Sequence, residues 1–168
     1  GMNALRPLKY IAIFLVILLA VTLLFVGYFF LTANVSISAF KAQGIPASQV
    51  PEQFAELKAA VQDKTFRGTV FGTPALGEAD DYALITYTLR LNNQCLVPID
   101  MIEVQVVPEP TDILQLVDEA VHSLGPKSQG DITATILVPK DSHTVRELVV
   151  TYYVWGVSFS IKEVYSGR

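Results

Sequence analysis

Few residues of this chain could carry out chemistry, because its 168 residues include only two histidines and one cysteine. Asp141, Ser142 and His143 are consecutive and supply all three residue types of a hydrolase triad. A triad needs a histidine that reaches both other side chains, whereas neighbours in a short turn point in different directions. Serine and aspartate also favour turns. We therefore expect a turn and no enzyme; only His122 or His143 in a cleft beside a carboxylate would change that expectation.

Three acidic residues, Glu78, Asp80 and Asp81, precede a predicted strand that begins at Tyr82. Calcium takes several oxygen ligands, and loops at the end of a β-sandwich can supply them. Three acids on a short loop are more often a solvated turn, and their spacing does not match an EF-hand. These residues are thus the candidate metal ligands, but we expect no bound metal. We also expect no cofactor, since the chain has no phosphate-binding glycine loop.

An aromatic cluster near the C-terminus offers a candidate ligand or partner surface. Trp155 and Tyr153 are its leading members, and Tyr152, Phe159 and Tyr165 lie close in sequence. Aromatic residues favour strands and dominate cores, so core packing is the competing interpretation for most of them. Trp155 precedes Gly156, where a tight hairpin is expected, and should be partly exposed. The single Cys95 is expected to be a small buried hydrophobe.

Charge and composition narrow the class of protein. The chain has 12 basic and 16 acidic residues and a net charge of −4, which gives no support to nucleic-acid binding. Its length corresponds to one ordinary domain with a short addition. One cysteine excludes an internal disulfide framework and a cysteine-clustered zinc site.

The apolar residues are concentrated in residues 11–31, a segment without a charge in which only Thr22 and Gly27 lie outside the apolar set. As a helix it would be roughly 31 Å long, the thickness of the hydrocarbon core of a bilayer. We predict a transmembrane helix over residues 11–32. A cleaved signal peptide is the alternative, but its apolar region should be shorter and end at an A-x-A-like site.

Arg6 and Lys9 closely precede the span, and only Lys41 follows within ten residues. The positive-inside rule then places residues 1–10 in the cytoplasm and the rest of the chain outside it. We expect a single-pass protein of the cell membrane.

Residues 33–64 are expected to form a linker and a short amphipathic helix. Residues 32–50 contain several small residues with Gly44 and Pro46, which indicates a connector. From Pro51 to Lys64 the chain is rich in helix formers, and Phe54, Leu57 and Val61 fall on one helix face. We expect this face to pack on the adjacent domain; a partner-binding or membrane-surface helix is the alternative.

From residue 65 to residue 168 the apolar period changes to two, as in strands with one buried face. Residues 83–91, 102–106, 132–138 and 157–161 alternate in this way, and residues 148–155 are apolar on both faces, which indicates a central strand. With turn signals between them, about seven strands predict an Ig-like antiparallel β-sandwich. Residues 111–124 fit a strand followed by a loop or a helix; we favour the strand.

Residues 89–106 read L-R-L-N-N-Q-C-L-V-P-I-D-M-I-E-V-Q-V, and Leu124-Gly125-Pro126 precedes a late strand. This arrangement resembles the LEA14-like and FxLYD-like immunoglobulin-type sandwiches of bacterial membrane-anchored proteins. The F-x-L-Y-D string is missing, and Lys127 stands where the family usually has glycine. The resemblance implies the fold and an accessory, binding or stress-related role, and it carries over no catalytic residue.

Together these features predict a membrane-anchored, extracytoplasmic β-sandwich without catalytic activity. We expect it to act in protein–protein interaction, or as an accessory part of an envelope complex, with an unidentified protein partner. The alternative is a receptor for a small ligand or carbohydrate that uses the end loops or Trp155. A pocket lined by exposed aromatic residues would favour the receptor.

Overall fold

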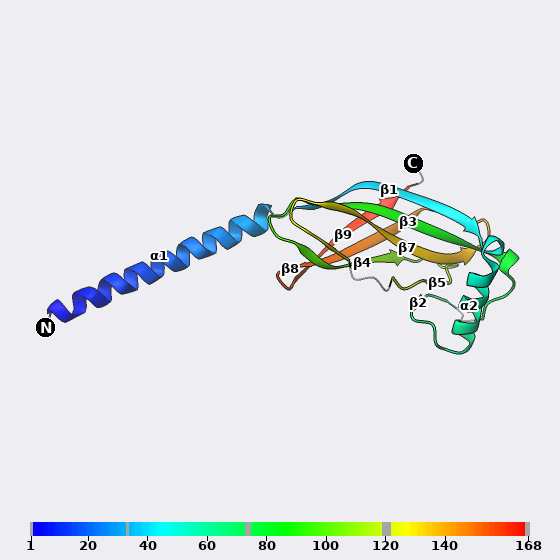
Figure 1. Cartoon of the computed structure of the whole chain (residues 1–168), viewed down its shortest axis with the longest axis horizontal. Helices are drawn as coiled ribbons and strands as arrows, with labels where there is room; N and C mark the ends of the chain where they lie inside the picture. Colours follow the sequence, from blue (N-terminus) through cyan, green and yellow to red (C-terminus); the bar gives the residue numbers. More distant parts are fainter. Residues whose placement is uncertain (1, 33, 73–74, 119–121, 167–168) are drawn as a thin grey trace.

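The computed structural model describes residues 2–32, 34–72, 75–118 and 122–166 of the chain. A long N-terminal helix is followed by a domain built mainly of strands (Figure 1). In chain order the elements are α1 (Met2–Thr32), β1 (Val35–Pro46), the 3-10 helix η1 (Ala47–Gln49), α2 (Pro51–Gln62), β2 (Thr69–Val70), the 3-10 helix η2 (Ala79–Asp81), β3 (Tyr82–Asn93), β4 (Ile99–Val107), β5 (Leu114–Gln115), β6 (His122–Leu124), β7 (Gln129–Pro139), β8 (Arg146–Val154) and β9 (Val157–Tyr165).

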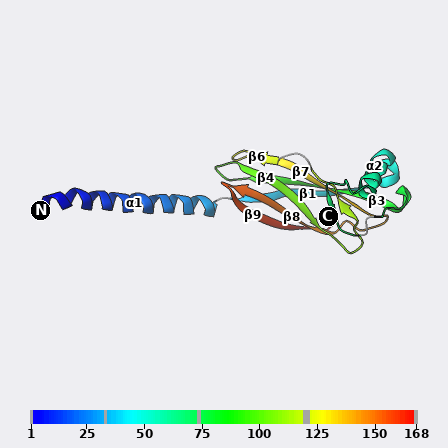
Figure 2. The same ribbon diagram turned by 90° about the horizontal axis from the view of Figure 1, so that it is seen from below.

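The strands form two antiparallel sheets, which confirms the prediction of a mainly β sandwich preceded by a helix. One sheet has the strand order β1-β3-β7-β5-β2, and the other has the order β6-β4-β8-β9. Helix α1 projects from one end of the domain, and α2 lies at the opposite end in both views (Figures 1 and 2). The helix α1 is long and apolar enough over Leu5–Tyr28 to cross a membrane.

The main core lies between the two sheets and comes from alternate residues of their strands. On β3 the inward residues Tyr87, Leu89 and Leu91 are fully buried, as the period of two predicts. Strand β8 lies between β4 and β9, which confirms its central position. Partly buried aromatic and aliphatic residues of β1 and β9 complete this core at its margins.

A second, smaller core lies beneath α2. Phe54, Leu57 and Val61 are buried on the inward face of the helix, and the ring of Phe54 stacks on that of Tyr82 at 5.6 Å. They pack with Leu84, Leu114 and Leu137 from the larger sheet. The prediction that this helix packs on the adjacent domain is therefore confirmed.

The connector predicted for residues 32–50 is wrong over most of its length. Strand β1 pairs with β3 from Val35 opposite Asn93 to Pro46 opposite Ala83. As the edge strand of its sheet, β1 has many exposed positions, so small and polar residues occupy sites where a central strand would be apolar. Its alternating pattern is correspondingly weak.

Some predicted strands are shorter than expected. Only Thr69–Val70 is a strand in the segment 65–72. Between residues 111 and 124 the described part contains Leu114–Gln115 and His122–Leu124 as strands and no helix, so the strand interpretation is confirmed there. Counting these short strands, the described residues form nine rather than about seven.

The side chain of Asn93, at the end of β3, ties together the loops nearest α1. Its Nδ2 lies 2.9–3.2 Å from the carbonyl oxygens of Val97, Leu124 and Gly125. Its Oδ1 accepts the backbone N–H of Cys95 at 3.0 Å. Asn93 is fully buried, so these bonds replace the water that its amide would otherwise need.

A buried ion pair joins the β4–β5 connection to the start of β8. The Nε and Nη2 of Arg146 donate to the carboxylate of Asp112 at 2.8 and 2.7 Å, and the side chains are 1% and 0% exposed. Arg146 Nη1 also donates to the carbonyl oxygens of His143 and Val145, and Asp112 accepts the N–H of Glu109. Burial lowers the pKa of Arg146, but the hydrogen bonds and charge of Asp112 outweigh it, so its pKa is raised.

Replacing Asp112 with alanine would leave the Arg146 guanidinium buried without its counter-charge. We expect the free energy of unfolding to fall by about 3–5 kcal/mol. Denaturant unfolding of the full chain in detergent micelles measures the change. The control is Asp131→Ala, which removes the partner of Arg90 from a half-exposed pair and should leave the unfolding midpoint nearly unchanged. Equal losses in both variants would contradict the role assigned to the buried pair.

We expect the domain to lose stability at alkaline pH because the side chain of Tyr87 is buried in its neutral form. Burial raises the pKa of Tyr87 above its ordinary 10.0, and its hydroxyl donates to the carbonyl oxygen of Thr144 at 2.8 Å. Its neutral form is thus favoured in the native state, and its contribution to stability is complete below about pH 10 and falls as the pH rises further.

We therefore expect the free energy of unfolding of the Tyr87→Phe variant to fall less than that of the wild type between about pH 9 and pH 11. At neutral pH the substitution itself should lower the free energy of unfolding by roughly 1 kcal/mol, because it removes the hydrogen bond to Thr144. Unfolding curves at each pH test this expectation, with Tyr153→Phe as the control for loss of a half-buried hydroxyl. Parallel pH profiles for the wild type and Tyr87→Phe would refute it.

Candidate functional site

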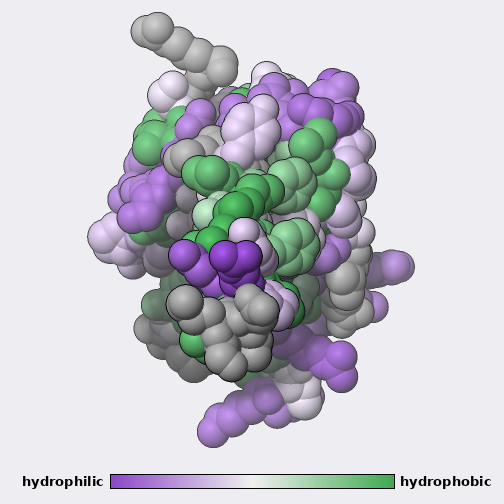
Figure 3. Space-filling model, turned by 90° about the vertical axis from the view of Figure 1, so that its left-hand side faces the viewer, coloured by the Kyte–Doolittle hydropathy of each residue, from purple (hydrophilic) through white to green (hydrophobic). Residues whose placement is uncertain are grey.

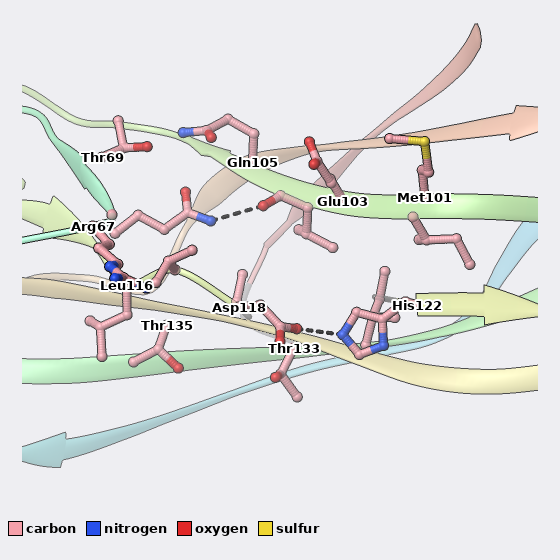
Figure 4. A pocket seen from close by; sticks show the side chains of 17 residues that line it. Arg67, Thr69, Met101, Glu103, Gln105, Leu116, Asp118, His122, Thr133 and Thr135 are labelled. Atoms are coloured by element: carbon pink, nitrogen blue, oxygen red, sulfur yellow. Dashed lines mark hydrogen bonds and ion pairs between the residues drawn. The ribbon is translucent and has the colours of Figure 1, made fainter. Parts of the chain in front are cut away.

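A groove of about 520 Å³ runs along one side of the sandwich, between the edges of the two sheets. We call it the seam groove. It is lined by residues 67–69, 101–105, 115–118 and 132–135 and by His122 (Figure 4). These segments belong to both sheets and to the connections around β2, β5 and β6, so only the folded domain brings them together.

Among the residues that the structure describes, no strand covers the outer edge of β4 along its full length, and the seam groove lies along this edge. The described part of β6 pairs with β4 at Ile99 and Ile102, with an irregular register between them. Farther along, the side chain of Gln115 takes the place of a strand. Its Nε2 donates to the carbonyl oxygen of Val104 at 2.8 Å, and its Oε1 accepts the N–H of Val106 at 2.9 Å. A side-chain amide thereby joins the larger sheet to the smaller one.

His122 and Asp118 form a hydrogen-bonded pair within the seam groove. The His122 Nε2 lies 2.5 Å from Asp118 Oδ2, and the two side chains are 28% and 41% exposed (Figure 4). A histidine beside a carboxylate in a cleft is the arrangement that, from the sequence, would change the expectation that the protein is not an enzyme. A triad also requires a nucleophile bonded to the imidazole. Among the described residues, no hydroxyl or thiol makes a hydrogen bond to His122, so the pair offers polar binding groups but no assigned catalytic role.

The remaining lining of the seam groove mixes charges of both signs with apolar side chains. Arg67 and Glu103 add a positive and a negative charge to the His122–Asp118 pair, and Met101 and Val117 are exposed apolar residues. None of the described residues that line it is phenylalanine, tyrosine or tryptophan. The groove therefore lacks the large aromatic rings on which sugars commonly stack, and its chemistry suits a ligand with both charged and apolar groups.

The aromatic candidates lie elsewhere. Trp155 and Gly156 have φ angles of 50° and 77° and form the turn between β8 and β9, as the hairpin prediction requires. Trp155 is 56% exposed, and Tyr153 pairs with Ser158 and with Asp100. In contrast, Tyr152 faces inward and stacks on Phe159 at 5.7 Å. None of these aromatic residues lines the seam groove, so the structure separates the predicted surface from the pocket.

The acidic candidates lie at the end of the domain away from α1. Glu78, Asp80 and Asp81 are exposed around η2, and the backbone of Asp81 bonds to Glu78 and Lys140. In the described part of the chain, no group of three or more histidine, cysteine, aspartate or glutamate residues could hold a metal ion. The structure therefore does not assemble these three carboxylates into a metal centre.

Asp141, Ser142 and His143 lie in the connection between β7 and β8. The Ser142 hydroxyl donates to the carbonyl oxygen of Pro139 at 2.6 Å, and His143 Nδ1 lies 3.2 Å from Nη1 of Arg146. In the region the structure describes, no hydrogen bond joins the three residues to one another. Their arrangement is that of a turn. Cys95 is buried, in agreement with its predicted role.

Apart from His122, the residues that build the seam groove were not identified as site residues from the sequence. Gln115 interrupts an apolar run, which was the only available signal of its special role. Asp118 lies in the loop after β5 and His122 begins β6, and the two side chains meet only in the folded domain. Arg67 and Glu103 are ordinary charged residues in sequence, and only the packing of the two sheets places them in one groove.

No protein-family model matches this chain, and comparison with curated proteins finds no match. The resemblance to LEA14-like and FxLYD-like sandwiches thus stays a prediction.

Replacing Gln115 with leucine tests whether its amide closes the edge of β4. The variant would leave the N–H of Val106 and the carbonyl of Val104 without their partner, and we expect a stability loss of about 1–3 kcal/mol. Hydrogen exchange at the Val106 amide should accelerate more than exchange in β8. The neighbouring Gln105→Leu variant keeps the Gln115 bridge and is the control. Unchanged protection of Val106 in Gln115→Leu would refute the role of the bridge.

Proposed function

We propose that this chain is a single-pass membrane protein that holds its β-sandwich outside the cytoplasm and binds a protein partner through the seam groove. The anchor is supported by α1, which is long and apolar enough over Leu5–Tyr28 to cross a membrane and is not buried by any described part of the protein. In Figure 3, where the end carrying α1 faces the viewer, apolar residues gather at the centre and hydrophilic residues lie mainly around them. Such an apolar surface needs a lipid environment.

The orientation and the uncleaved state of the anchor also have support. Arg6 and Lys9 precede the apolar span, which favours a cytoplasmic N-terminus. Of the two mature starts that a cleaved signal peptide would give, near Asn34 or near Phe40, the second would remove the first part of β1, which pairs with β3 along the edge of the larger sheet. A start at Asn34 would keep β1 intact, and retention of α1 keeps the sandwich both complete and tethered.

The seam groove is the observation on which the binding role depends. It is elongated along β4 and β7, and its lining offers a cation, carboxylates, an imidazole and apolar side chains within one cleft. An extended polypeptide segment presents the same mixture of groups, with backbone donors and acceptors at regular intervals. A protein partner that inserts such a segment therefore fits the groove in shape and in chemistry.

A small polar molecule is the second candidate ligand, because the volume of the seam groove lies within the range of roughly 300–1,000 Å³ typical of small-molecule sites. The absence of phenylalanine, tyrosine and tryptophan from its described lining disfavours a carbohydrate. Native mass spectrometry of the purified full chain would detect a small molecule that copurifies with it.

Site-specific photocrosslinking in the native membrane tests the protein partner. A photoreactive amino acid at Gln105 lies in the seam groove, and one at Lys162 is its matched control. Both residues are exposed and pair with Val149 from opposite sides, so they lie in one row of the same sheet. We expect a discrete protein adduct from position 105 and none from position 162.

The charge-reversal variant Glu103→Lys should reduce the position-105 adduct several-fold, because it changes the charge balance of the groove. The control Glu163→Lys reverses an exposed charge on β9 and should leave the adduct unchanged. Adducts of equal yield from both positions, or an adduct insensitive to Glu103→Lys, would argue against recognition in the seam groove.

A further inference from the structure

Three loops form the end of the sandwich nearest α1, and we call them together the proximal loops. They comprise residues 94–98, 125–128 and 155–156. The N–H of Gln94 donates to the carbonyl oxygen of Asn34, which places the first loop beside the start of β1. The N–H of Lys127 donates to the carbonyl oxygen of Cys95, and pairing between β4 and β8 brings the third loop to the same end. Figures 1 and 2 show α1 leaving from this end.

The composition of the proximal loops is unusual for an acidic domain. Their only charged residue is Lys127, which is exposed. Leu96 and Trp155 are 60% and 56% exposed. Exposed acidic residues are more numerous toward the opposite end, among them Glu52, Glu56, Glu78, Asp80, Asp81 and Asp141. Asp100, at the start of β4, is an exposed acid close to the proximal loops. The proximal loops themselves are thus largely apolar with one positive charge, although the whole chain is acidic.

Trp155 occupies a backbone position that disfavours its side chain. Its φ of 50° lies in the left-handed region, where bulky residues are rare and where hairpin turns favour asparagine, aspartate or glycine. The turn therefore holds a large, exposed indole at a site where a small polar residue would be less strained. A tryptophan with one apolar surface and one N–H donor suits the boundary between lipid and water.

The short connection to α1 brings the proximal loops to that boundary. The charges of Arg6 and Lys9 keep the start of α1 outside the hydrocarbon, so a span of about 20 residues ends near residue 30. Thr32 ends α1 and Val35 begins β1, a distance of at most roughly 10 Å even if the chain is extended. The headgroup layer is itself about 5–8 Å thick on each side of the bilayer.

We propose that the proximal loops are seated in the headgroup layer of the membrane, with Trp155 and Leu96 as apolar contacts and Lys127 near the lipid phosphates. This inference rests on the proposed anchoring by α1. The lipid contact fixes the sandwich upright on the bilayer, so that the seam groove opens sideways and its height above the membrane is constant.

Tryptophan fluorescence of the full chain in phosphatidylcholine liposomes tests the inference, because Trp155 is the only tryptophan. Lipids brominated near the carbonyl end of their acyl chains quench an indole at the headgroup boundary. We expect an about two-fold loss of Trp155 emission in these liposomes and a smaller loss with bromines near the chain ends.

Two variants in a Trp155→Phe background complete the experiment. Val164→Trp places the indole at the other end of β9, roughly 23 Å along the strand from Val157, and should show no quenching. Val16→Trp places it within α1 and should be quenched strongly by bromines near the chain ends. If Val16→Trp is not quenched, the anchor itself fails. If it is quenched while Trp155 behaves like Val164→Trp, only the seating of the proximal loops is overturned.

Discussion

The arrangement of this protein depends on the short connection between helix α1 and strand β1. Thr32 ends α1, Val35 begins β1, and β1 then pairs with β3 along its length. Because β1 begins three residues after α1 ends, its first residue stays within roughly 10 Å of the end of the helix. The loop end of the sandwich therefore lies beside α1, and α2 covers the distant end (Figure 1). The seam groove lies along the side of the sandwich, lined by parts of β4 and β7.

Polar side chains join the parts of the domain that strand pairing does not. Asn93 forms hydrogen bonds to two of the loops at the α1 end, and Gln115 links the two sheets. The Arg146–Asp112 pair connects the β4–β5 loop to β8. Within the described residues, every buried side-chain nitrogen and oxygen has a hydrogen-bond partner. A partly satisfied network would be costly in a dry interior, so these contacts favour one arrangement of the sheets. The seam groove is a consequence, since a single glutamine bridges an edge that a strand would otherwise close.

Much of the fold could be predicted because it depends on local pattern. The face of Phe54, Leu57 and Val61 identified α2, and Gly156 identified the β8–β9 hairpin. Strand β1 was missed because an edge strand with a wet face carries small and polar residues, like a connector. The candidate site was not predictable in the same way. Arg67, Glu103 and Asp118 have no distinctive spacing, and they share a groove only because two sheets separate there.

The sequence by itself determined the features that follow from one-dimensional pattern: an apolar span as long as a bilayer is thick, a period of two in the domain beyond it, and the turn at Trp155 and Gly156. The tertiary structure decided which residues meet. It joined His122 to Asp118, buried Arg146 against Asp112 and placed the Trp155 turn at the end of the sandwich from which α1 leaves rather than in the pocket. The physical reason is that hydrophobic period specifies which face of a strand is buried, whereas contacts between distant segments depend on sheet order and register, which nearby residues do not encode.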